Sequence, residues 1–339
     1  MSEVLILSQA DIRRVLTMGD AIRGVEEAYV QKSTGKGCLF PLVCHVFEPE
    51  KADLDIKSGH LAGSGIYGLK LVSWFGDNEH KGLPALFGTT LLFDDATGAP
   101  IALLNAGAVT GMRTGAAGAV GAKYLARKDA RRMLMAGTGA QAPYQIAAML
   151  LALPGIDEVT LCSPRHPEKA AAEVETVAAR VEELLGGERK TPYTLRPSAD
   201  LAGSVNASDV IVTATPARGG FIRREWVRPG THLSCVGADM TGKQELESEL
   251  LASSRVFVDD REQAVTVGEC ELPIRQGLFH REDIAGEMGE LIAGLLPGRT
   301  DEGQITVFDS TGIALQDLVV SKAAVDRARQ QGLGVTASL

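Results

Sequence analysis

Apolar residues at helical spacing dominate the first part of the chain, directly after Ser8. They form the series Ile12, Val15, Leu16, Ile22, Val25, Ala28 and Tyr29. This spacing is typical of an amphipathic helix, and a serine before the first turn can accept hydrogen bonds from its unpaired backbone N–H groups. The pattern therefore predicts one helix over residues 8–32.

Between residues 38 and 104 the apolar positions form short runs separated by turn residues. The runs read PLVCHVF, YGLKLVSWF, FGTTLLFD and PIALL. The tetrapeptide DATG, residues 95–98, stands between the last two runs and is typical of a hairpin turn. We expect this segment to form an antiparallel sheet.

From residue 131 to about residue 310, strand-like apolar runs alternate with helical stretches. The runs read RRMLMAG, EVTLCS, VIVTATP, THLSCVG and RVFVDD. Such alternation is typical of βαβ units around a parallel sheet. The C-terminal stretch GIALQDLVVSKAAVDRARQQG again has the pattern of an amphipathic helix, which we expect to pack on the N-terminal part of the chain.

Length and charge agree with two folded lobes and argue against several classes of protein. A chain of 339 residues is longer than a single hydrophobic core usually supports. A net charge of −9 without a long Lys/Arg run argues against a nucleic-acid surface. No apolar stretch approaches the ~20 residues that span a membrane, and the N-terminus lacks the basic and small-residue features of a signal peptide.

The cysteines and histidines give no sign of a metal site. The five cysteines are scattered without a CxxC pair, and the six histidines include no HExxH motif. Scattered cysteines in odd number fit reduced thiols better than disulfides. We therefore expect a cytoplasmic protein without a bound metal.

Glycines mark the stretch NAGAVTGMRTGAAGAVGAKYLAR, which begins at residue 105. They are spaced three or four residues apart: Gly107, Gly111, Gly115, Gly118 and Gly121. Glycine costs roughly 1 kcal/mol at each position inside a helix, so a helix with this nearly bare face needs a reason. Close packing against a sheet and proximity to a ligand are both open.

The stretch GTGAQA, residues 137–142, lies between a strand-like run and a helical one. Gly137 would make the turn, Gly139 would let the backbone approach a pyrophosphate, and Ala142 is small where helix and strand pack. The start of the helix would offer N–H groups and a positive dipole end to the phosphates. A tight connection without a ligand is the alternative, but the flanking alternation favours dinucleotide binding.

Together these patterns predict an α/β fold with two domains. Residues 121–313 form a Rossmann-type, doubly wound parallel sheet. Residues 1–120 form a mixed α+β domain, which the helix at 314–339 completes.

The end of the second strand of the Rossmann region bears on the choice between NAD and NADP. NAD-binding folds usually carry an acidic residue there, about 20 residues beyond the turn, which holds the ribose 2′-OH. Ser163, Arg165 and His166 occupy this region instead. A hydroxyl and a guanidinium suit a 2′-phosphate, so NADP is favoured over NAD. The alternative is a solvated loop in which Arg165 binds nothing.

Three charged residues stand in otherwise small or apolar stretches: Lys70 in IYGLKLVSWF, Arg113 in the glycine-rich helix, and Asp239 at the end of CVGAD. Substrates of open α/β sheets bind beyond the carboxyl ends of the strands, where Asp239 lies. A lysine and an arginine suit a carboxylate, and an aspartate near a nicotinamide could hold or deprotonate an amine. A buried ion pair or a snorkelling side chain is the alternative for each residue.

Several ordered blocks carry a resemblance to a known family. They read GLKLVSWFGDN, GLPALFGTTLLFD, TGMRTGAAGAVGAKYLAR, GTGAQAPYQ, VTATP, VGADMTGKQEL, VDDREQA and ITVFDSTGIALQDL. Over nearly the whole chain, they resemble the ornithine cyclodeaminase/mu-crystallin family. The resemblance implies a homodimer in which domain 1–120 with helix 314–339 forms the subunit interface and part of the substrate site. Domain 121–313 would then bind NAD(P).

The resemblance also implies roles for single residues. Lys70 and Arg113 match contacts to the substrate carboxylate, and Asp239 matches the acidic residue that acts on the substrate amine. Ser310 and Thr311 match a loop that reaches the cofactor and the substrate. From this match and the motifs above, the further candidates for cofactor contacts are Thr114, Gly137, Gly139, Ala140, Gln141, Ser163, Arg165, Thr213, Val236, Gly237, Ala238 and Lys243.

Two positions depart from the family members that bind ornithine. Those carry an arginine after a proline in the first strand of the substrate domain, where this chain has Val43 or His45. They also carry a carboxylate for the distal ammonium, where this chain has Lys57. Like charges at ~4 Å repel by ~1 kcal/mol even in bulk water, so ornithine is disfavoured. A second cation suits a second carboxylate, unless Lys57 points to solvent.

The predicted function is therefore an NAD(P)H-dependent reductase of small 2-imino acids, cyclic ketimines and dicarboxylic ones included, or an amino-acid dehydrogenase running in reverse. Lys70 and Asp239 are the catalytic candidates, and Asp239 would hold or protonate the imine nitrogen. Arg113 and Lys70 would bind the substrate, together with Lys57 and Thr311. Two alternatives stay open: an ammonia lyase of the cyclodeaminase kind that uses NAD catalytically, and a non-catalytic binding protein of the mu-crystallin kind.

Overall fold

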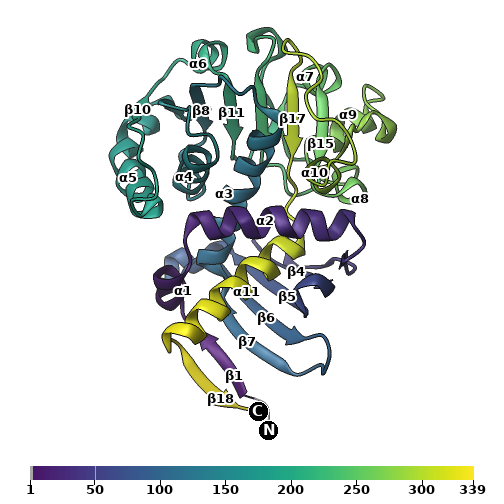
Figure 1. The fold of residues 1–339 in the computed structure, drawn as a ribbon. Helices are drawn as coiled ribbons and strands as arrows, with labels where there is room; N and C mark the ends of the chain where they lie inside the picture. The colour runs from purple at the N-terminus through teal and green to yellow at the C-terminus, as the bar shows by residue number, and fades with distance from the viewer. Residues whose placement is uncertain (1–2, 50) are drawn as a thin grey trace. The chain divides into compact units, whose positions relative to one another are not determined.

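The chain divides into two compact units, Met1–Arg113 with Ile313–Leu339 and Thr114–Gly312 (Figure 1). The computed structural model describes residues 3–49 and 51–339. The first division falls inside helix α3 (Ala106–Leu125), and the second lies directly before helix α11 (Ala314–Gln331). The sequence predicts divisions after residues 120 and 313 instead. The binding roles of the two parts stay predictions.

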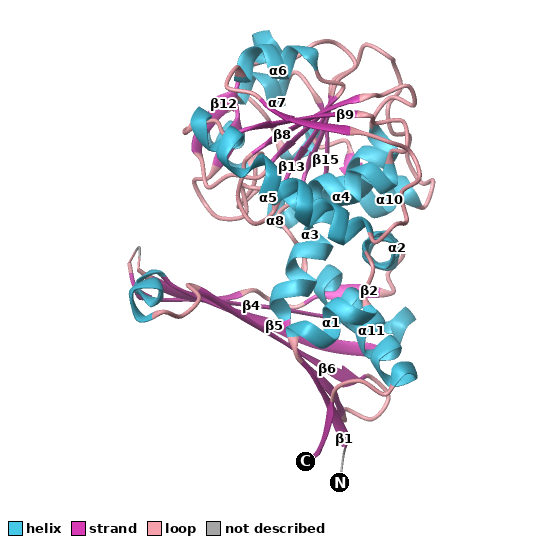
Figure 2. Cartoon of the chain, turned by 90° about the vertical axis from the view of Figure 1, so that its left-hand side faces the viewer, coloured by secondary structure: helices cyan, strands magenta, loops and turns pink. Residues whose placement is uncertain are grey.

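The first unit is built on a mixed sheet in the order β18-β1-β7-β6-β5-β4-β2, with β3 also paired to β4. Its strands are β1 (Glu3–Leu7), β2 (Gly37–Leu39), β3 (Val43–Glu48), β4 (Ala52–Leu61), β5 (Ile66–Phe75), β6 (Leu86–Asp94), β7 (Pro100–Asn105) and β18 (Val335–Ser338). Strands β4, β5, β6 and β7 pair antiparallel, and Figure 2 shows the first three side by side. The hairpin predicted at 95–98 is confirmed, because it joins β6 to β7.

Two helices replace the single helix predicted over residues 8–32, so that prediction was wrong. Helix α1 spans Gln9–Val15, and α2 spans Met18–Ser33. Thr17 begins the second helix with its own capping box. Its hydroxyl accepts from the backbone N–H of Asp20, and the Asp20 carboxylate accepts from the backbone N–H of Thr17. Such a reciprocal pair satisfies N–H groups at a helix start, which is why the first helix does not continue through this point.

The C-terminal helix α11 packs against α2 and against the strands β4, β5 and β6 (Figure 1). The expectation that this helix returns to the N-terminal part of the chain is confirmed. Leu315 and Leu318 on α11 are fully buried, and so is the charged residue Asp317 between them. The helix thus carries a carboxylate into the interior of the first unit.

The second unit is built on a parallel sheet in the order β10-β9-β8-β11-β13-β17-β15-β16. Its strands are β8 (Arg132–Ala136), β9 (Glu158–Cys162), β10 (Thr194–Pro197), β11 (Val210–Thr213), β13 (His232–Cys235), β15 (Arg255–Val258), β16 (Gly286–Glu287) and β17 (Thr306–Asp309). The connecting helices are α4 (Ala142–Ala152), α5 (Pro167–Leu185), α6 (Leu201–Ala207), α7 (Ser248–Ala252), α8 (Arg261–Ala264), α9 (Glu271–Arg275) and α10 (Met288–Ile292). A short pair, β12 (Arg218–Ile222) and β14 (Gln244–Leu246), lies outside this sheet.

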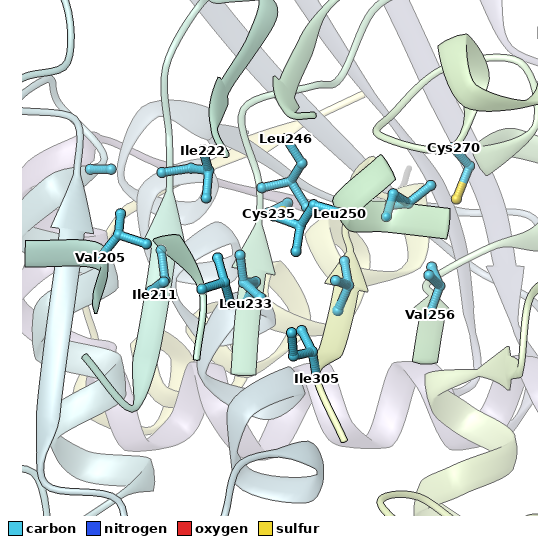
Figure 3. Close-up of a cluster of buried hydrophobic side chains, with 14 of the residues drawn as sticks. Val205, Ile211, Ile222, Leu233, Cys235, Leu246, Leu250, Val256, Cys270 and Ile305 are labelled. Carbon is cyan, nitrogen blue, oxygen red and sulfur yellow. The ribbon is translucent and has the colours of Figure 1, made fainter. Parts of the chain in front are cut away.

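Both faces of the parallel sheet are buried, which explains its continuous apolar runs. In β8, Met133 and Met135 join one hydrophobic cluster, while Leu134 and Ala136 join another. Figure 3 shows the second cluster, which gathers side chains from several strands and from α6 and α7. The predicted doubly wound parallel sheet is confirmed.

Three glycines of helix α3 pack so closely inside the second unit that a larger residue would overlap its neighbours at each position. A Cβ at Gly115 would lie 2.5 Å from the carbonyl oxygen of Tyr144 in α4. At Gly118 and Gly121 a Cβ would overlap the side chains of Gln145 and Phe308, respectively. Of the two reasons left open by the sequence, close packing therefore accounts for these three positions.

Candidate functional site

Two buried cations of the first unit share one buried carboxylate. Lys70 Nζ on β5 lies 2.8 Å from Asp317 Oδ2, and Arg113 Nε on α3 lies 3.1 Å from Asp317 Oδ1. Lys70 is 3% exposed, Arg113 8% and Asp317 0%. The structure thus brings together the lysine and the arginine that stood out in the sequence, through an aspartate that the sequence analysis did not select.

The charges of this cluster do not cancel. Burial, followed by the charge of Arg113, lowers the pKa of Lys70 to about 7, against the opposite effect of Asp317. Burial raises the pKa of Asp317, but Arg113 and Lys70 outweigh this effect and hold it below its ordinary value. With Lys70 protonated, the three groups carry one net positive charge, and an anion bound beside them would stabilise that state.

Two hydrogen bonds orient the arginine. Arg113 Nη1 donates to Gln316 Oε1 at 3.0 Å, and Gln316 Nε2 donates to the hydroxyl of Tyr29 at 2.5 Å. Gln316 precedes Asp317 on α11. One turn of that helix therefore contacts both Nη1 and Nε of the Arg113 guanidinium. The guanidinium is therefore preorganised for a ligand.

Thr90 and Lys57 flank Lys70 on the neighbouring strands. In the strand register, Lys70 stands opposite Thr90 of β6 and opposite Lys57 of β4. Directly opposed residues of an antiparallel pair point to the same face of the sheet. Thr90 is fully buried, and its hydroxyl has no hydrogen-bond partner among the residues that the structure describes. Lys57 is half-buried, and its charge also depresses the pKa of Lys70.

In the second unit, the GTGAQA stretch forms a tight turn between β8 and α4. Gly137 adopts φ +130°, and a Cβ there would lie 2.5 Å from the carbonyl oxygen of Ala214. Around Gly139, in contrast, a Cβ would meet nothing within 4 Å. The helix begins at Ala142 with Gln141 as its N-cap residue, as expected. The Gln141 Oε1 atom is buried and has no hydrogen-bond partner in the described part of the chain.

This turn has the features that a dinucleotide requires. The open space at Gly139 lets a phosphate approach the backbone, and the N-terminus of α4 offers N–H groups and the positive end of the helix dipole. Ala140 lies in the same turn. The orphaned amide oxygen of Gln141 is a polar atom that a bound ligand can satisfy. The residues present therefore fit a dinucleotide.

Other predicted cofactor residues lie at the carboxyl ends of neighbouring strands. Thr213 ends β11, and its hydroxyl donates to the carboxylate of Glu245 at 2.7 Å. Val236, Gly237 and Ala238 follow β13, and the backbone N–H of Gly237 donates to the same carboxylate at 3.0 Å. The side chain of Thr213 thus binds the protein itself, through a glutamate that sequence analysis missed.

Asp239 and Lys243 form an ion pair of 2.6 Å beyond β13. The side chain of Asp239 is 51% exposed, and that of Lys243 is 17% exposed. The predicted catalytic aspartate and the predicted cofactor lysine are therefore neighbours. Their roles stay predictions.

The loop after β17 is held by Asp259. Ser310 Oγ donates to Asp259 Oδ2 at 3.2 Å, Thr311 Oγ1 donates to Oδ1 at 2.8 Å, and the backbone N–H of Gly312 donates to Oδ2 at 2.7 Å. Burial raises the pKa of Asp259, against the effect of these donors. The two predicted hydroxyl residues are thus fixed by Asp259, a third carboxylate that was not selected from the sequence.

The remaining candidates lie at two other places. Ser163 directly follows β9, and Arg165 is exposed just before α5. The carbonyl oxygen of Thr114, in α3, accepts from Gln145 Nε2 at 2.9 Å.

Residues 3–49 and 51–339 contain no group of three or more His, Cys, Asp or Glu side chains able to hold a metal ion. Within the same residues, none of the helices has both the length and the apolar character for a membrane span.

Comparison with known proteins gives one consistent family. The model of the ornithine cyclodeaminase/mu-crystallin family matches residues 2–332. An archaeal alanine dehydrogenase, a dimer with bound NAD, is 36% identical with a TM-score of 0.87 and covers 99% of both chains. The iminosuccinate reductase of Paracoccus denitrificans in complex with NAD⁺ is 32% identical, with a TM-score of 0.89 and coverage of 99% of this chain and 100% of that one.

A third solved structure is similar over the same length. It is the Δ1-pyrroline-2-carboxylate reductase of Thermococcus litoralis in complex with NADH and L-proline. It is 30% identical, with a TM-score of 0.87, and covers 98% of this chain and 99% of that one. These likenesses extend over both units.

Replacement of Asp317 by asparagine would remove the counter-charge of two buried cations. We expect D317N to lower the free energy of unfolding by about 3 kcal/mol, as when one partner of a buried ion pair is removed. Asp326→Asn is the matched control, because its pair with Lys322 lies on the same helix and is partly exposed, and such pairs contribute less than about 1 kcal/mol. Urea unfolding measures both. Equal losses in the two variants would contradict this account.

Proposed function

Because the chain belongs to the ornithine cyclodeaminase/mu-crystallin family, we propose that it is an NAD(P)H-dependent reductase of small 2-imino acids. The observation that carries the proposal is the buried cluster of Lys70, Arg113 and Asp317, whose net positive charge with Lys70 protonated suits a carboxylate. The turn at 137–142 supports the dinucleotide. The product is the 2-amino acid.

The substrate's α-carboxylate binds Arg113 and Lys70. The Arg113 guanidinium can donate to two carboxylate oxygens. The Thr90 hydroxyl is a further donor, because it has no hydrogen-bond partner among the described residues. Bound NAD(P)H supplies the hydride that the α-carbon of the C=N bond accepts. Asp239 holds or protonates the imine nitrogen, so that hydride and proton together give the amine.

A dicarboxylic substrate fits the first unit best. Lys57, Lys70 and Arg113 place three cations around one buried carboxylate, Asp317. A second substrate carboxylate would neutralise the charge that remains once the first is bound. The relative from Paracoccus denitrificans, an iminosuccinate reductase, supports this substrate class. A distal ammonium, as in ornithine, would be repelled by Lys57.

Purified protein with NADPH or NADH, a 2-oxo acid and ammonium or methylamine tests the proposal directly. The 2-oxo acids are oxaloacetate, pyruvate and glyoxylate, and oxidation of the cofactor is followed by absorbance. We expect amine-dependent oxidation. The proposal fails if none of these acids supports it, nor pyrroline- or piperideine-2-carboxylate. Ammonia release from a diamino acid without net oxidation would indicate a cyclodeaminase instead.

The second substrate carboxylate depends on Lys57. We expect Lys57→Ala to raise KM about tenfold for oxaloacetate with ammonium, which corresponds to about 1.4 kcal/mol. KM for pyruvate with ammonium should change less than about twofold, since this substrate lacks the second carboxylate. Lys36→Ala is the control, because Lys36 is exposed in the same unit. Equal effects of K57A on both substrates would exclude this role.

NADP is the cofactor that the end of β9 favours. Ser163 and the exposed Arg165 lie where an acidic residue would hold the 2′-OH of NAD, although the solved relatives contain NAD, NADH and NAD⁺. We expect Arg165→Ala to weaken NADPH binding about tenfold and NADH binding less than about twofold. Calorimetric titration measures both, with Lys169→Ala as an exposed control. A wild-type preference for NADH would overturn this assignment.

We also propose a homodimer through the first unit. Large apolar side chains are exposed at one end of its sheet, among them Val46 (58%) and Phe47 (53%) on β3 and Leu86 (51%) and Phe87 (47%) on β6. Exposed apolar patches of this kind mark interaction surfaces. The archaeal alanine dehydrogenase is a dimer, which supports this assignment.

A charge in this surface should separate the subunits. We expect Phe47→Asp to be monomeric in sedimentation equilibrium at concentrations where the wild type is a dimer, because an unpaired charge would be buried in the interface. Leu295→Asp is the control, since Leu295 is 66% exposed in the second unit. A dimeric F47D, or a monomeric wild type, would contradict the proposed interface.

A further inference from the structure

Glu245 is a buried carboxylate surrounded by hydrogen-bond donors. It lies in β14 and is 0% exposed. Its Oε1 accepts from the backbone N–H and the hydroxyl of Thr215, both at 2.7 Å. Its Oε2 accepts from the hydroxyl of Thr213 at 2.7 Å and from the backbone N–H of Gly237 at 3.0 Å. The donor set is that of an ionised carboxylate.

These donors belong to the loops that leave two neighbouring strands. Thr213 ends β11, Gly237 follows β13, and the two strands are adjacent in the sheet. A Cβ at Gly237 would lie 2.5 Å from the carbonyl oxygen of Thr215. Glu245 therefore ties together two loops that already touch.

The turn after β8 packs on the same loop. Strand β8 is the other neighbour of β11, and a Cβ at Gly137 would lie 2.5 Å from the carbonyl oxygen of Ala214. A shift of the loop 213–215 would therefore disturb the turn at Gly137 as well as that at Gly237. The loop that Glu245 holds is the middle one of three at the ends of β8, β11 and β13.

Three further titratable groups surround this carboxylate. Glu269 accepts from the backbone N–H groups of Glu245 and Leu246 at 2.8 and 2.9 Å, and Asp309 and the thiol of Cys235 lie nearby. Burial, followed by repulsion from Glu245 and Asp309, raises the pKa of Glu269 well above its ordinary value. Burial raises the pKa of Asp309 to about 7 and that of Cys235 well above its ordinary value.

Geometry places the negative charge on Glu245, because four hydrogen-bond donors of the described residues point at its two oxygens and only two point at Glu269. Burial raises the pKa of Glu245 to about 7, and the donors at Thr213, Thr215 and Gly237 limit the rise. A protonated Glu245 would present an O–H to donors. The threonine hydroxyls can turn and accept, but the backbone N–H groups of Thr215 and Gly237 cannot. The protonated oxygen can donate to its threonine hydroxyl but becomes a poorer acceptor. Protonation would thus weaken the hydrogen bond from the backbone N–H of Thr215 or of Gly237, and with it the hold on one of the two loops.

We propose that ionised Glu245 is a positioning residue for the dinucleotide, because it holds the loop 213–215 and the turn at Gly237 in the conformation that receives the cofactor. The inference rests on the proposed function, in which the second unit binds NAD(P) at these strand ends. Glu245 itself is buried and acts through its partners. It should therefore affect the binding of the cofactor and not that of the carboxylate substrate.

Calorimetric titration with NAD⁺ at pH 8 tests this role without turnover. We expect Glu245→Gln to raise Kd at least about tenfold, because the amide NH₂ group faces a donor that it cannot accept from. Glu249→Gln, the same change at an exposed position four residues away, should leave Kd within about twofold. In kinetics, E245Q should raise KM for the cofactor and leave KM for the carboxylate substrate within about twofold.

The pH dependence separates this role from a merely structural one. A group with a pKa of about 7 is about tenfold less ionised at pH 6 than at pH 8. The wild-type Kd for NAD⁺ should therefore rise up to about tenfold as the pH falls from 8 to 6. The Kd of E245Q should stay flat over the same range, since its amide does not titrate.

Thr215 supplies a second test if E245Q does not fold, as judged by circular dichroism. Thr215→Val removes one donor to Glu245 and should raise Kd about threefold, and Thr215→Ser should restore the wild-type value. Equal Kd values for wild type, E245Q and T215V would overturn the positioning role and leave the proposed function intact. A wild type that binds neither NAD⁺ nor NADPH would overturn both.

Discussion

The first unit depends on one electrostatic constraint: Lys70 and Arg113 can be buried together only with a counter-charge. Each buried ion loses several kcal/mol of hydration, and the two cations also repel each other. Asp317, carried inward by α11, stands 2.8 and 3.1 Å from them. Asp317 supplies one negative charge for two positive ones. It therefore stabilises the buried cations but leaves one positive charge without a counter-charge. That residual positive charge, present when Lys70 is protonated, is the basis of the proposed carboxylate site.

The second unit uses buried carboxylates in a different way. Glu245 and Asp259 each accept hydrogen bonds from loops that leave the ends of parallel strands. Both acids are buried and bind backbone and hydroxyl groups of these loops. Open α/β sheets bind their ligands at this edge, so buried carboxylates fix the conformation of the loops that form it.

Sequence patterns predict most of the second unit and less of the first. Strands buried on both faces, such as β8 and β11, are continuous apolar runs and are easily recognised. β4 reads ADLDIKSGHL and is mostly half-buried, so its alternation is weak and the sequence analysis did not select it. The break between α1 and α2 was also missed, because the apolar spacing continues across the cap at Thr17.

In the first unit, site residues were predicted where a charge interrupts a small or apolar stretch. Lys70 and Arg113 stood out for that reason, and the structure joins them. Asp317 offers the same signal, since Leu315, Leu318 and Val319 surround it, but the amphipathic pattern of the helix concealed it. Glu245 lies in a polar segment, and Asp259 directly follows the apolar strand β15. Neither position reveals its hydrogen-bond partners, which lie up to 32 and 53 residues away in the sequence. The roles of Asp239, Lys243 and Arg165 stay predictions.

Transfer of deuterium tests the central claim most directly. The protein would be given NAD(P)H with deuterium at the position of the transferred hydride, together with oxaloacetate and ammonium. Mass spectrometry and NMR of the amino acid formed would then locate the label. The account predicts one deuterium at the α-carbon for each cofactor oxidised. An amino acid without deuterium at that carbon would contradict it.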